Sequence, residues 1–222
     1  MMRNDIFKYS EEEITILKAK DRRLAEIIEK VGHIEREIIP DLFSALVNSI
    51  VGQQISTKAH ATIWDRMLTE IGYPITPECI DATDADTLQK FGITFKKAEY
   101  IKKAARKVID GELNIERLQE LPDDEVCAEL VKLDGIGVWT AEMLMIFSMQ
   151  RPDILSYGDL AILRGMRMVY HHRKITKEMF AKYKRRLSPY ASVASLYFWA
   201  VAGGAIPGMK DYAPKEKRRA EK

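Results

Sequence analysis

Apolar residues recur at helical spacing along most of the chain, and this periodicity restricts the fold more than any other feature. In residues 42–51 they stand at positions i, i+1, i+4, i+5, i+8 and i+9, which makes one wide buried face, and Gly52 follows as a stop signal. Similar stripes occupy residues 17–31, 63–71 and 98–109. No stretch alternates strictly between apolar and polar residues, and no pair of β-branched runs flanks a hairpin turn. The sequence therefore predicts an all-α fold.

The composition describes a globular chain of modest size. Its 222 residues suffice for one ordinary domain or two small lobes, and 46% hydrophobic with 31% charged residues argues against a disordered chain. No run approaches the ~18 apolar residues of a membrane helix, and the amino terminus lacks the features of a secretory signal. Two cysteines, Cys79 and Cys127, are too few for a disulfide framework or a four-cysteine metal centre. We therefore expect a cytoplasmic protein without a membrane partner or a metal.

The positive charge of the chain is concentrated rather than large. A net charge of +2 neither requires nor excludes nucleic acid. Basic residues gather in three segments: Lys96, Lys97, Lys102, Lys103, Arg106 and Lys107; Arg164, Arg167, Arg173 and Lys174; Lys182, Lys184, Arg185 and Arg186. Each cluster alone is most simply a solvated helix face. Three clusters beside a DNA-binding motif would favour phosphate contacts.

Residues 133–141 read LDGIGVWTA and lie between two predicted helices. Gly135 and Gly137 permit a tight turn, and the helix that begins at Val138 would present unpaired N–H groups to an anion. A DNA phosphate could approach closely because no side chain intervenes. Two glycines at this spacing also occur at ordinary helix corners, so the full string, rather than the glycines, carries the specificity.

The full string resembles the hairpin of the helix-hairpin-helix (HhH-GPD) DNA glycosylase superfamily, and the resemblance spans about residues 34–204. It implies an essential aspartate some twenty residues later, and Asp159 stands 22 residues after Gly137 in ILSYGDLAILRGM. An aspartate at this position is also a good helix N-cap, and the two roles are compatible. As the catalytic residue, Asp159 would stabilise the oxocarbenium character of the sugar and orient the attacking water.

The resemblance also implies a DNA-binding surface. The segment VNSIVGQQIS looks like the family's glutamine-bearing loop, in which Gln53 or Gln54 would enter the duplex. The segment FGITFKKAEYI resembles the stretch that supplies a minor-groove wedge, with Phe95 as the best match and Ile93 as the next. The complete set of expected DNA-binding residues is Gly135, Ile136, Gly137, Val138, Thr140, Gln53, Gln54, Phe95 and Lys96.

Within the superfamily, SLYFWAVAGG is most similar to the last helix of the 3-methyladenine DNA glycosylase II group, whose base pocket includes a tryptophan. That position is Trp199, and the implied pocket also contains Trp139, Met143 and Tyr157. Tryptophan faces attract a cationic alkylated base by ~0.5–2 kcal/mol each. Packing in the core is the alternative role for both tryptophans.

Two absences in the sequence bear on the reaction and on cofactors. Relatives with lyase activity have a lysine two residues after the second hairpin glycine, where this chain has Trp139, so strand cleavage is not expected. Relatives with an iron–sulfur cluster have four cysteines near the carboxyl end, which this chain lacks. We expect no cofactor, with a monovalent cation at the hairpin carbonyls near Leu133 as the one open possibility. The chain departs from the methyladenine enzymes at Met143, where they have an aromatic residue, and it has no room for their amino-terminal α/β domain.

These observations predict two helical lobes with an active-site cleft between them. One lobe would comprise residues 34–150 and end in the hairpin; the other would join 1–33 to 151–222 and carry Asp159. The resemblance implies a monomeric, nucleoid-associated DNA N-glycosylase that flips alkylated purines such as 3-methyladenine and 7-methylguanine out of damaged duplex DNA. The alternatives are a related glycosylase for a mismatched, deaminated or oxidised base, or a non-catalytic helix-hairpin-helix protein that binds DNA structure.

Overall fold

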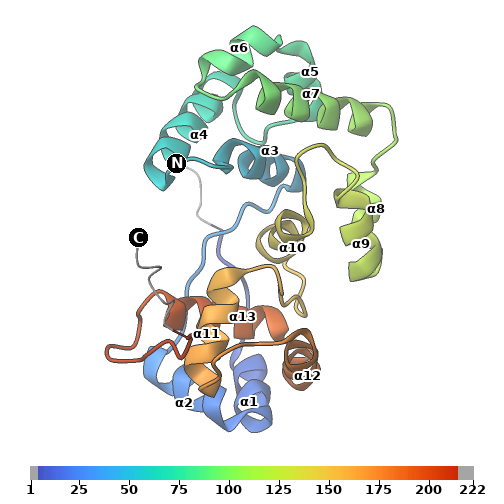
Figure 1. The fold of residues 1–222 in the computed structure, drawn as a ribbon. Coiled ribbons are helices and arrows are strands. Elements are labelled where there is room, and N and C mark those ends of the chain that lie inside the picture. The colour runs from blue at the N-terminus through green and yellow to red at the C-terminus, as the bar shows by residue number, and fades with distance from the viewer. Residues whose placement is uncertain (1–4, 215–222) are drawn as a thin grey trace, which may run out of the picture. The chain divides into compact units, whose positions relative to one another are not determined.

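The computed structural model describes residues 5–214, and within this range it contains thirteen helices and no strand (Figure 1). The sole β-type pairing there is an isolated bridge between Ile6 and Glu37. The predicted all-α fold is confirmed. None of the helices in the described range combines the length and apolar character needed to cross a membrane.

The chain divides into two compact units. The first, here called the hairpin unit, contains residues 5–7 and 37–150 of the described chain, and the second, the Asp159 unit, contains 8–36 and 151–214. The sequence-based division differs in placing residues 5–7 with the second lobe and 34–36 with the first. The bridge at Ile6, together with a hydrogen bond of 2.8 Å from Ile38 N to Asp5 O, attaches residues 5–7 to the hairpin unit.

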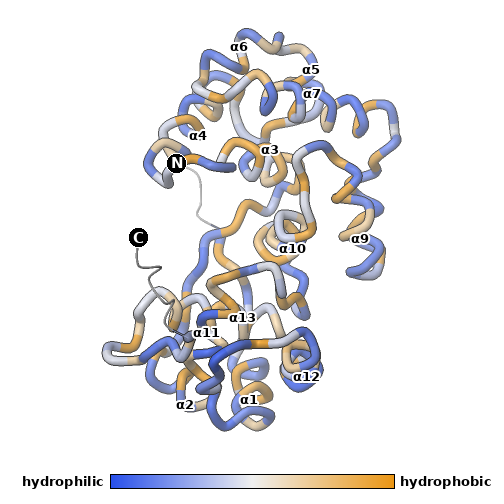
Figure 2. The backbone as a smooth tube through the Cα atoms, in the orientation of Figure 1, coloured by the Kyte–Doolittle hydropathy of each residue, from blue (hydrophilic) through white to orange (hydrophobic). Residues whose placement is uncertain are grey.

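The hairpin unit is built from eight helices: α3 (Leu42–Gly52), α4 (Thr57–Ile71), α5 (Pro77–Ala82), α6 (Ala85–Lys90), α7 (Phe95–Ile109), α8 (Ile115–Leu118), α9 (Asp123–Leu130) and α10 (Val138–Phe147). Apolar residues dominate α3 and α10 (Figure 2), which is typical of helices that are buried around most of their circumference. The lysine-rich α7 packs against both α5 and α6 with its apolar stripe. Most side chains of α3 are buried, and Val47 and Ile50 are fully so.

The Asp159 unit contains five helices: α1 (Glu11–Lys20), α2 (Arg22–Val31), α11 (Leu160–Tyr170), α12 (Lys177–Leu187) and α13 (Ala191–Ala202). The periodicity of residues 17–31 indicated one helix, but the structure has two helices there, α1 and α2. Asp21 has extended backbone angles (φ −144°, ψ 102°), and its carboxylate accepts a hydrogen bond from Leu24 N at 3.0 Å. A strong N-cap residue therefore ends α1 and begins α2, although the apolar spacing continues across it.

Candidate active site and DNA interface

The hairpin has the backbone geometry that its two glycines predict, but the two positions differ. Gly135 has φ +82°, in the left-handed region that favours glycine. Gly137 has φ −91° and is the N-cap of α10, where no side chain caps the helix. The conformational requirement for glycine therefore applies at Gly135, whereas Gly137 leaves the amino terminus of α10 uncovered.

Three side chains from the hairpin unit hold this turn in place. Gln53 Nε2 donates a hydrogen bond of 2.8 Å to Gly135 O, and Lys103 Nζ pairs with Asp134 Oδ2 at 2.9 Å. The ring of Tyr100 lies so close to Gly135 that a Cβ atom there would be 2.6 Å from a ring carbon. The end of α3 and one face of α7 thus set the conformation of the hairpin. The motif itself contains no sign of these partners.

This difference between the glycines gives a matched pair of variants. Gly135→Ala should destabilise the protein and weaken DNA binding, because the left-handed backbone and the Tyr100 ring both oppose a Cβ atom. Gly137→Ala should retain its melting temperature, since a Cβ atom there meets nothing within 4 Å, yet it should weaken binding to damaged and undamaged duplex alike. Thermal melts and fluorescence anisotropy measure the two effects. Equal melting temperatures for both variants would contradict this account of Gly135.

Most cations of the first basic cluster make contacts inside the protein. Lys97 Nζ donates to Val51 O at 2.9 Å and to Gln53 O at 2.6 Å, at the carboxyl end of α3, and burial lowers the pKa of Lys97. A cation at the carboxyl end of a helix stabilises its unpaired carbonyl groups. Lys97 therefore anchors the loop after α3 rather than a phosphate.

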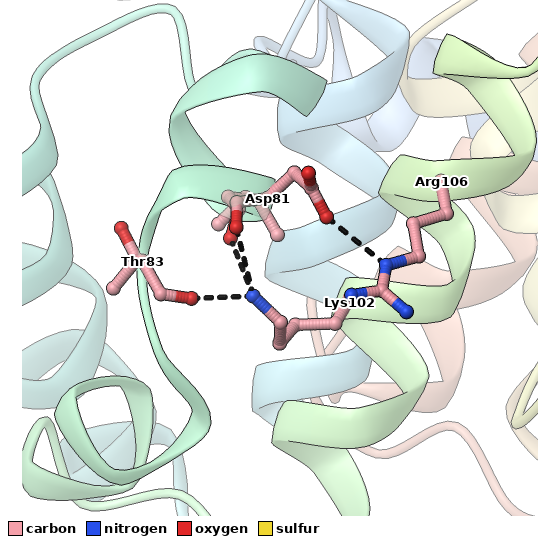
Figure 3. A network of polar contacts seen from close by, with 5 residues as sticks. Asp81, Thr83, Lys102 and Arg106 are labelled. Carbon is pink, nitrogen blue, oxygen red and sulfur yellow. Dashed lines mark hydrogen bonds and ion pairs between the residues drawn. The ribbon is translucent and has the colours of Figure 1, made fainter.

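Lys102 and Arg106 have the same kind of role at the end of α5 (Figure 3). Lys102 Nζ donates to Asp81 O at 3.0 Å and to Thr83 O at 2.6 Å, while Arg106 Nε donates to the Asp81 carboxylate at 3.1 Å. Lys107 lies 3.7 Å from a carboxylate oxygen of Glu112. These contacts favour the structural interpretation of the cluster.

Lys96 is the one cation of this cluster with neither a hydrogen bond nor an ion pair among residues 5–214. Its ammonium lies 5.6 Å from the centroid of the Tyr100 ring, beside the hairpin. In the Asp159 unit, Arg167 forms a two-pronged ion pair with Asp211, with distances of 2.8 and 2.6 Å. That arginine is likewise engaged within the protein, so Arg167 and most cations of the first cluster are less available to phosphate than their composition suggests.

The remaining expected DNA-binding residues differ in exposure. Gln54 is exposed and has a left-handed backbone (φ 55°), so it projects from the loop while Gln53 is tied to the hairpin. Phe95 is 54% exposed at the first position of α7, whereas Ile93 is 3% exposed and belongs to the core, which excludes Ile93 as the wedge. The side chains of Ile136 and Thr140 are also buried. Those two residues can meet DNA only through their backbone, because their side chains pack inward.

Asp159 occupies the N-cap of α11 and is buried, with 7% of its surface exposed. Its Oδ1 accepts hydrogen bonds from Ala161 N at 2.8 Å and Ile162 N at 2.9 Å, and its Oδ2 accepts one from Trp199 Nε1 at 3.2 Å. Asp159 therefore caps α11, and its catalytic role stays a prediction. Three N–H donors hold the carboxylate in a single orientation.

Trp199 lies on α13 and is half-buried. Its indole N–H points at Asp159, a contact that the sequence did not predict, since the resemblance assigned Trp199 only to the base pocket. Tyr157, also assigned to that pocket, packs edge-on against Phe180, with ring centroids 5.1 Å apart. The Asp159 unit thus brings Trp199 into direct contact with the candidate catalytic carboxylate.

The close approach of α11 and α13 makes this contact possible. A Cβ atom on Gly165 of α11 would lie 2.2 Å from the carbonyl oxygen of Phe198 on α13. The two backbones therefore touch at this point, which sets the distance between the start of α11 and Trp199. Gly165 appeared in the sequence only as one more residue of an apolar helix, so its role was missed.

Exposed apolar side chains occur beside the expected site residues of both units. Leu160, which follows Asp159, is 81% exposed, and sequence reasoning missed it. In the hairpin unit Val138 is exposed and Trp139 is 49% exposed, while Met143 is partly buried one turn further along α10. Trp139 is therefore not a core residue of its own unit, and the packing alternative fails for it.

The described residues contain no group of three or more histidine, cysteine, aspartate or glutamate side chains arranged to hold a metal ion. At the hairpin, Leu133 O accepts a hydrogen bond of 3.1 Å from Ile136 N. A carbonyl oxygen has a second lone pair, which is compatible with a monovalent cation. That cation stays a prediction.

Comparison with known proteins gives concordant results. Residues 47–189 match the family described as "HhH-GPD superfamily base excision DNA repair protein". The chain is 30% identical over 161 residues to DNA-3-methyladenine glycosylase 1 of Schizosaccharomyces pombe, covering 71% of each chain. The chain also matches two proteins of Bacillus subtilis, and each match covers 58% of the length of that relative.

Two solved structures extend the comparison to the fold. A DNA-3-methyladenine glycosidase from Bacillus halodurans superposes with a TM-score of 0.79 at 34% identity, covering 91% of this chain and 93% of that one. The 3-methyladenine DNA glycosylase of Schizosaccharomyces pombe, solved in complex with abasic DNA, superposes with a TM-score of 0.75 at 26% identity, covering 88% and 98%. The chain belongs to the HhH-GPD superfamily of base-excision DNA repair proteins. Within that superfamily it is a DNA glycosylase.

Proposed function

We propose that this glycosylase is monofunctional and releases alkylated purines of the 3-methyladenine and 7-methylguanine type from duplex DNA. The observation that carries the proposal is the carboxylate of Asp159, which is buried and oriented by three N–H donors. The names of the relatives, which refer to 3-methyladenine, support the substrate class. The complex of one relative with abasic DNA supports duplex DNA as the partner.

The chemistry requires only one carboxylate if the leaving base is cationic. Ordinary glycoside hydrolysis uses a second acid to protonate the leaving group. An N3- or N7-alkylated purine already carries a positive charge, and it leaves with the electron pair of the glycosidic bond as a neutral base. Asp159 stabilises the positive charge that develops on the sugar and accepts the proton of the water that adds to C1′.

The residue at the lyase position supports hydrolysis by water. A lyase needs an amine at this position to attack the sugar and form a Schiff base. Here the side chain is the indole of Trp139, which has no nucleophilic amine. The released product should therefore be an intact abasic strand that breaks only after treatment with alkali.

The substrate class is tested by base release from duplexes that each contain one defined lesion, with products separated by chromatography. Rates are divided by each lesion's spontaneous rate, because charged bases also leave faster unaided. We expect the largest enhancement for 3-methyladenine or 7-methylguanine. A neutral base as the best substrate would contradict the alkylpurine proposal and move the assignment to a mismatched, deaminated or oxidised base.

Trp199 can act by holding the carboxylate or by stacking on the base, and Trp199→Phe separates these roles. Phenylalanine keeps an aromatic face but removes the N–H donor to Asp159. We expect base release to fall about tenfold for alkylated and neutral bases alike, since a hydrogen bond to a charged group contributes ~1.5–3 kcal/mol. Single-turnover rates at saturating enzyme provide the measurement. Full activity of Trp199→Phe, with loss only in Trp199→Ala, would instead assign Trp199 to stacking.

The structure favours Gln54 over Gln53 as the residue that enters the duplex. Gln54→Ala should slow base release while leaving the melting temperature unchanged, because its side chain is exposed. Gln53→Ala should lower the melting temperature, because it removes the donor to Gly135 O. Melting curves and single-turnover rates of both variants test this assignment. The reverse pattern would show that Gln53 is the inserted residue.

A further inference from the structure

The Asp159 unit contains a cavity that the proposed reaction does not use. Its volume is about 310 Å³, and α2, α12 and the end of α11 all contribute to its lining. Asp159 precedes the first residue of α11, and Tyr170, which lines the cavity, is the last. An eleven-residue helix is ~16 Å long. The cavity is therefore well separated from the candidate catalytic carboxylate.

One wall of the cavity is a buried polar network centred on Asp21. Its Oδ1 accepts a hydrogen bond from Leu24 N, and its Oδ2 accepts from Tyr170 OH at 3.1 Å and from an Nη of Arg186 at 3.0 Å. The rings of Tyr170 and Tyr183 stack with centroids 4.0 Å apart. The carboxylate of Asp21 is thus engaged within the protein, and it leaves part of the Arg186 guanidinium to the cavity.

A surplus of positive charge surrounds this wall. Arg22 and Arg23 also line the cavity at its open rim; the Arg22 side chain is 94% exposed, and its Nε forms an ion pair with Glu26 at 3.7 Å. Arg23 is exposed and has no ion pair among residues 5–214. The lining thus contains three arginines and one carboxylate, that of Asp21, which contacts Arg186. Arg22 and Arg23 stand in the first turn of α2, where a cation opposes the helix dipole and acidic residues are usual.

His172 also lines the cavity, and its Nε2 lies 2.7 Å from Tyr183 OH. Burial, together with the charges of Arg23 and His171, lowers the pKa of His172. Burial also raises the pKa of Tyr183. Both directions favour the uncharged forms of His172 and Tyr183, so the arginines supply the positive charge of the lining.

We propose that this cavity binds a phosphate-type oxyanion through the guanidinium groups of Arg22, Arg23 and Arg186. Planar guanidinium groups recognise phosphate oxygens in a two-pronged manner, and a cavity of this size accommodates a phosphate group with part of an attached ester. The anion could belong to a free phosphate ester or to the DNA backbone. The site is independent of base release, so the two proposals can fail separately.

The test uses the full chain, with inorganic phosphate as the probe and chloride at equal ionic strength as the control. Nuclear magnetic resonance follows the ring of His172, and His33, which stacks on Tyr9 at 4.5 Å between ring centroids, serves as the internal reference. We expect a saturable shift at His172 that His33 does not share. Sulfate, whose charge is constant between about pH 5 and 8, should raise the pKa of His172, because a bound anion favours the imidazolium ion.

Two double variants with equal loss of charge make the test specific. R22Q/R23Q should weaken phosphate binding at least tenfold, whereas R173Q/R185Q, which changes exposed arginines outside the lining, should change it less than twofold. R22Q/R23Q should also keep its melting temperature without phosphate, since its arginines oppose the dipole of α2. Equal weakening in both variants, or no saturable response of His172, would overturn the proposal. A lower melting temperature of R22Q/R23Q would assign a structural role instead.

The source of the anion is decided with undamaged duplex DNA. If the backbone supplies it, R22Q/R23Q should reduce the slope of log affinity against log salt by about one or two relative to R173Q/R185Q. If the slopes agree while the wild-type chain still binds inorganic phosphate, the ligand is a free phosphate ester. Either outcome supports an oxyanion site in this cavity, and the salt slope identifies its ligand.

Discussion

Asp159→Asn is expected to lower the rate of base release by about 10²–10³ while the variant still binds abasic duplex. Asparagine removes the negative charge that stabilises the sugar in the transition state, and its amide cannot accept the proton of the attacking water. Its side-chain oxygen can still cap α11, since asparagine caps helices about as well as aspartate. Single-turnover release of 7-methylguanine, with fluorescence anisotropy for binding, measures the two effects separately.

Asp41→Asn is the matched control for this change. Asp41 is the N-cap of α3, and its carboxylate accepts a hydrogen bond of 2.7 Å from Ser44 N. The substitution makes the same chemical change at a helix start with no proposed catalytic role, so release should remain near the wild-type rate. If Asp159→Asn released base within threefold of the wild-type rate, Asp159 would have only its capping role.

Gly165→Ala should be among the most destabilising single substitutions in the Asp159 unit. Its Cβ atom would lie 2.2 Å from the carbonyl oxygen of Phe198, so α11 must move away from α13. Overpacking of a core costs about 1–3 kcal/mol and occasionally more, which outweighs the ~1 kcal/mol that alanine gains over glycine in a helix. We expect the free energy of unfolding to fall by about 2 kcal/mol, measured by urea denaturation.

The same displacement should lengthen the hydrogen bond between Trp199 and Asp159 and reduce base release in the protein that remains folded. Gly137→Ala is the control for the unfolding measurement, because its φ of −91° suits alanine and its Cβ atom would meet nothing within 4 Å. That variant should unfold within about 0.5 kcal/mol of the wild-type chain. A stable and fully active Gly165→Ala variant would show that the spacing of α11 and α13 does not position Asp159.

The helical character of the chain was predictable because it depends on local periodicity and capping. The apolar stripe of residues 42–51 and the stop at Gly52 correspond to α3, and the glycine turn before Val138 corresponds to the start of α10. The same reasoning failed at residues 17–31. There the apolar spacing runs through a break, and only the extended backbone of Asp21 reveals that two helices meet.

Asp159 was also predictable as a candidate, because the family resemblance implied an aspartate at this distance from the hairpin and the local sequence suits an N-cap. Three contacts were not predictable, because each joins residues that are 35 to 82 positions apart. They are the Tyr100 ring against Gly135, the hydrogen bond from Gln53 to Gly135 O, and the hydrogen bond from the Trp199 indole to Asp159. The basic cluster of α7 likewise has one property that was predictable and one that was not. Its charge was visible in the sequence, but whether Lys97 and Lys102 face phosphate or helix carbonyls was not.

The sequence by itself thus determined the all-α class, the hairpin and the candidate carboxylate, since each follows from residues near one another in the chain. Only the tertiary structure decided which glutamine is exposed, which lysines are engaged within the protein and which glycine brings α11 against α13. The physical reason is that hydrogen bonds and close packing act over a few ångströms in space. Their partners are chosen by the packing of helices, and a linear pattern does not record that packing.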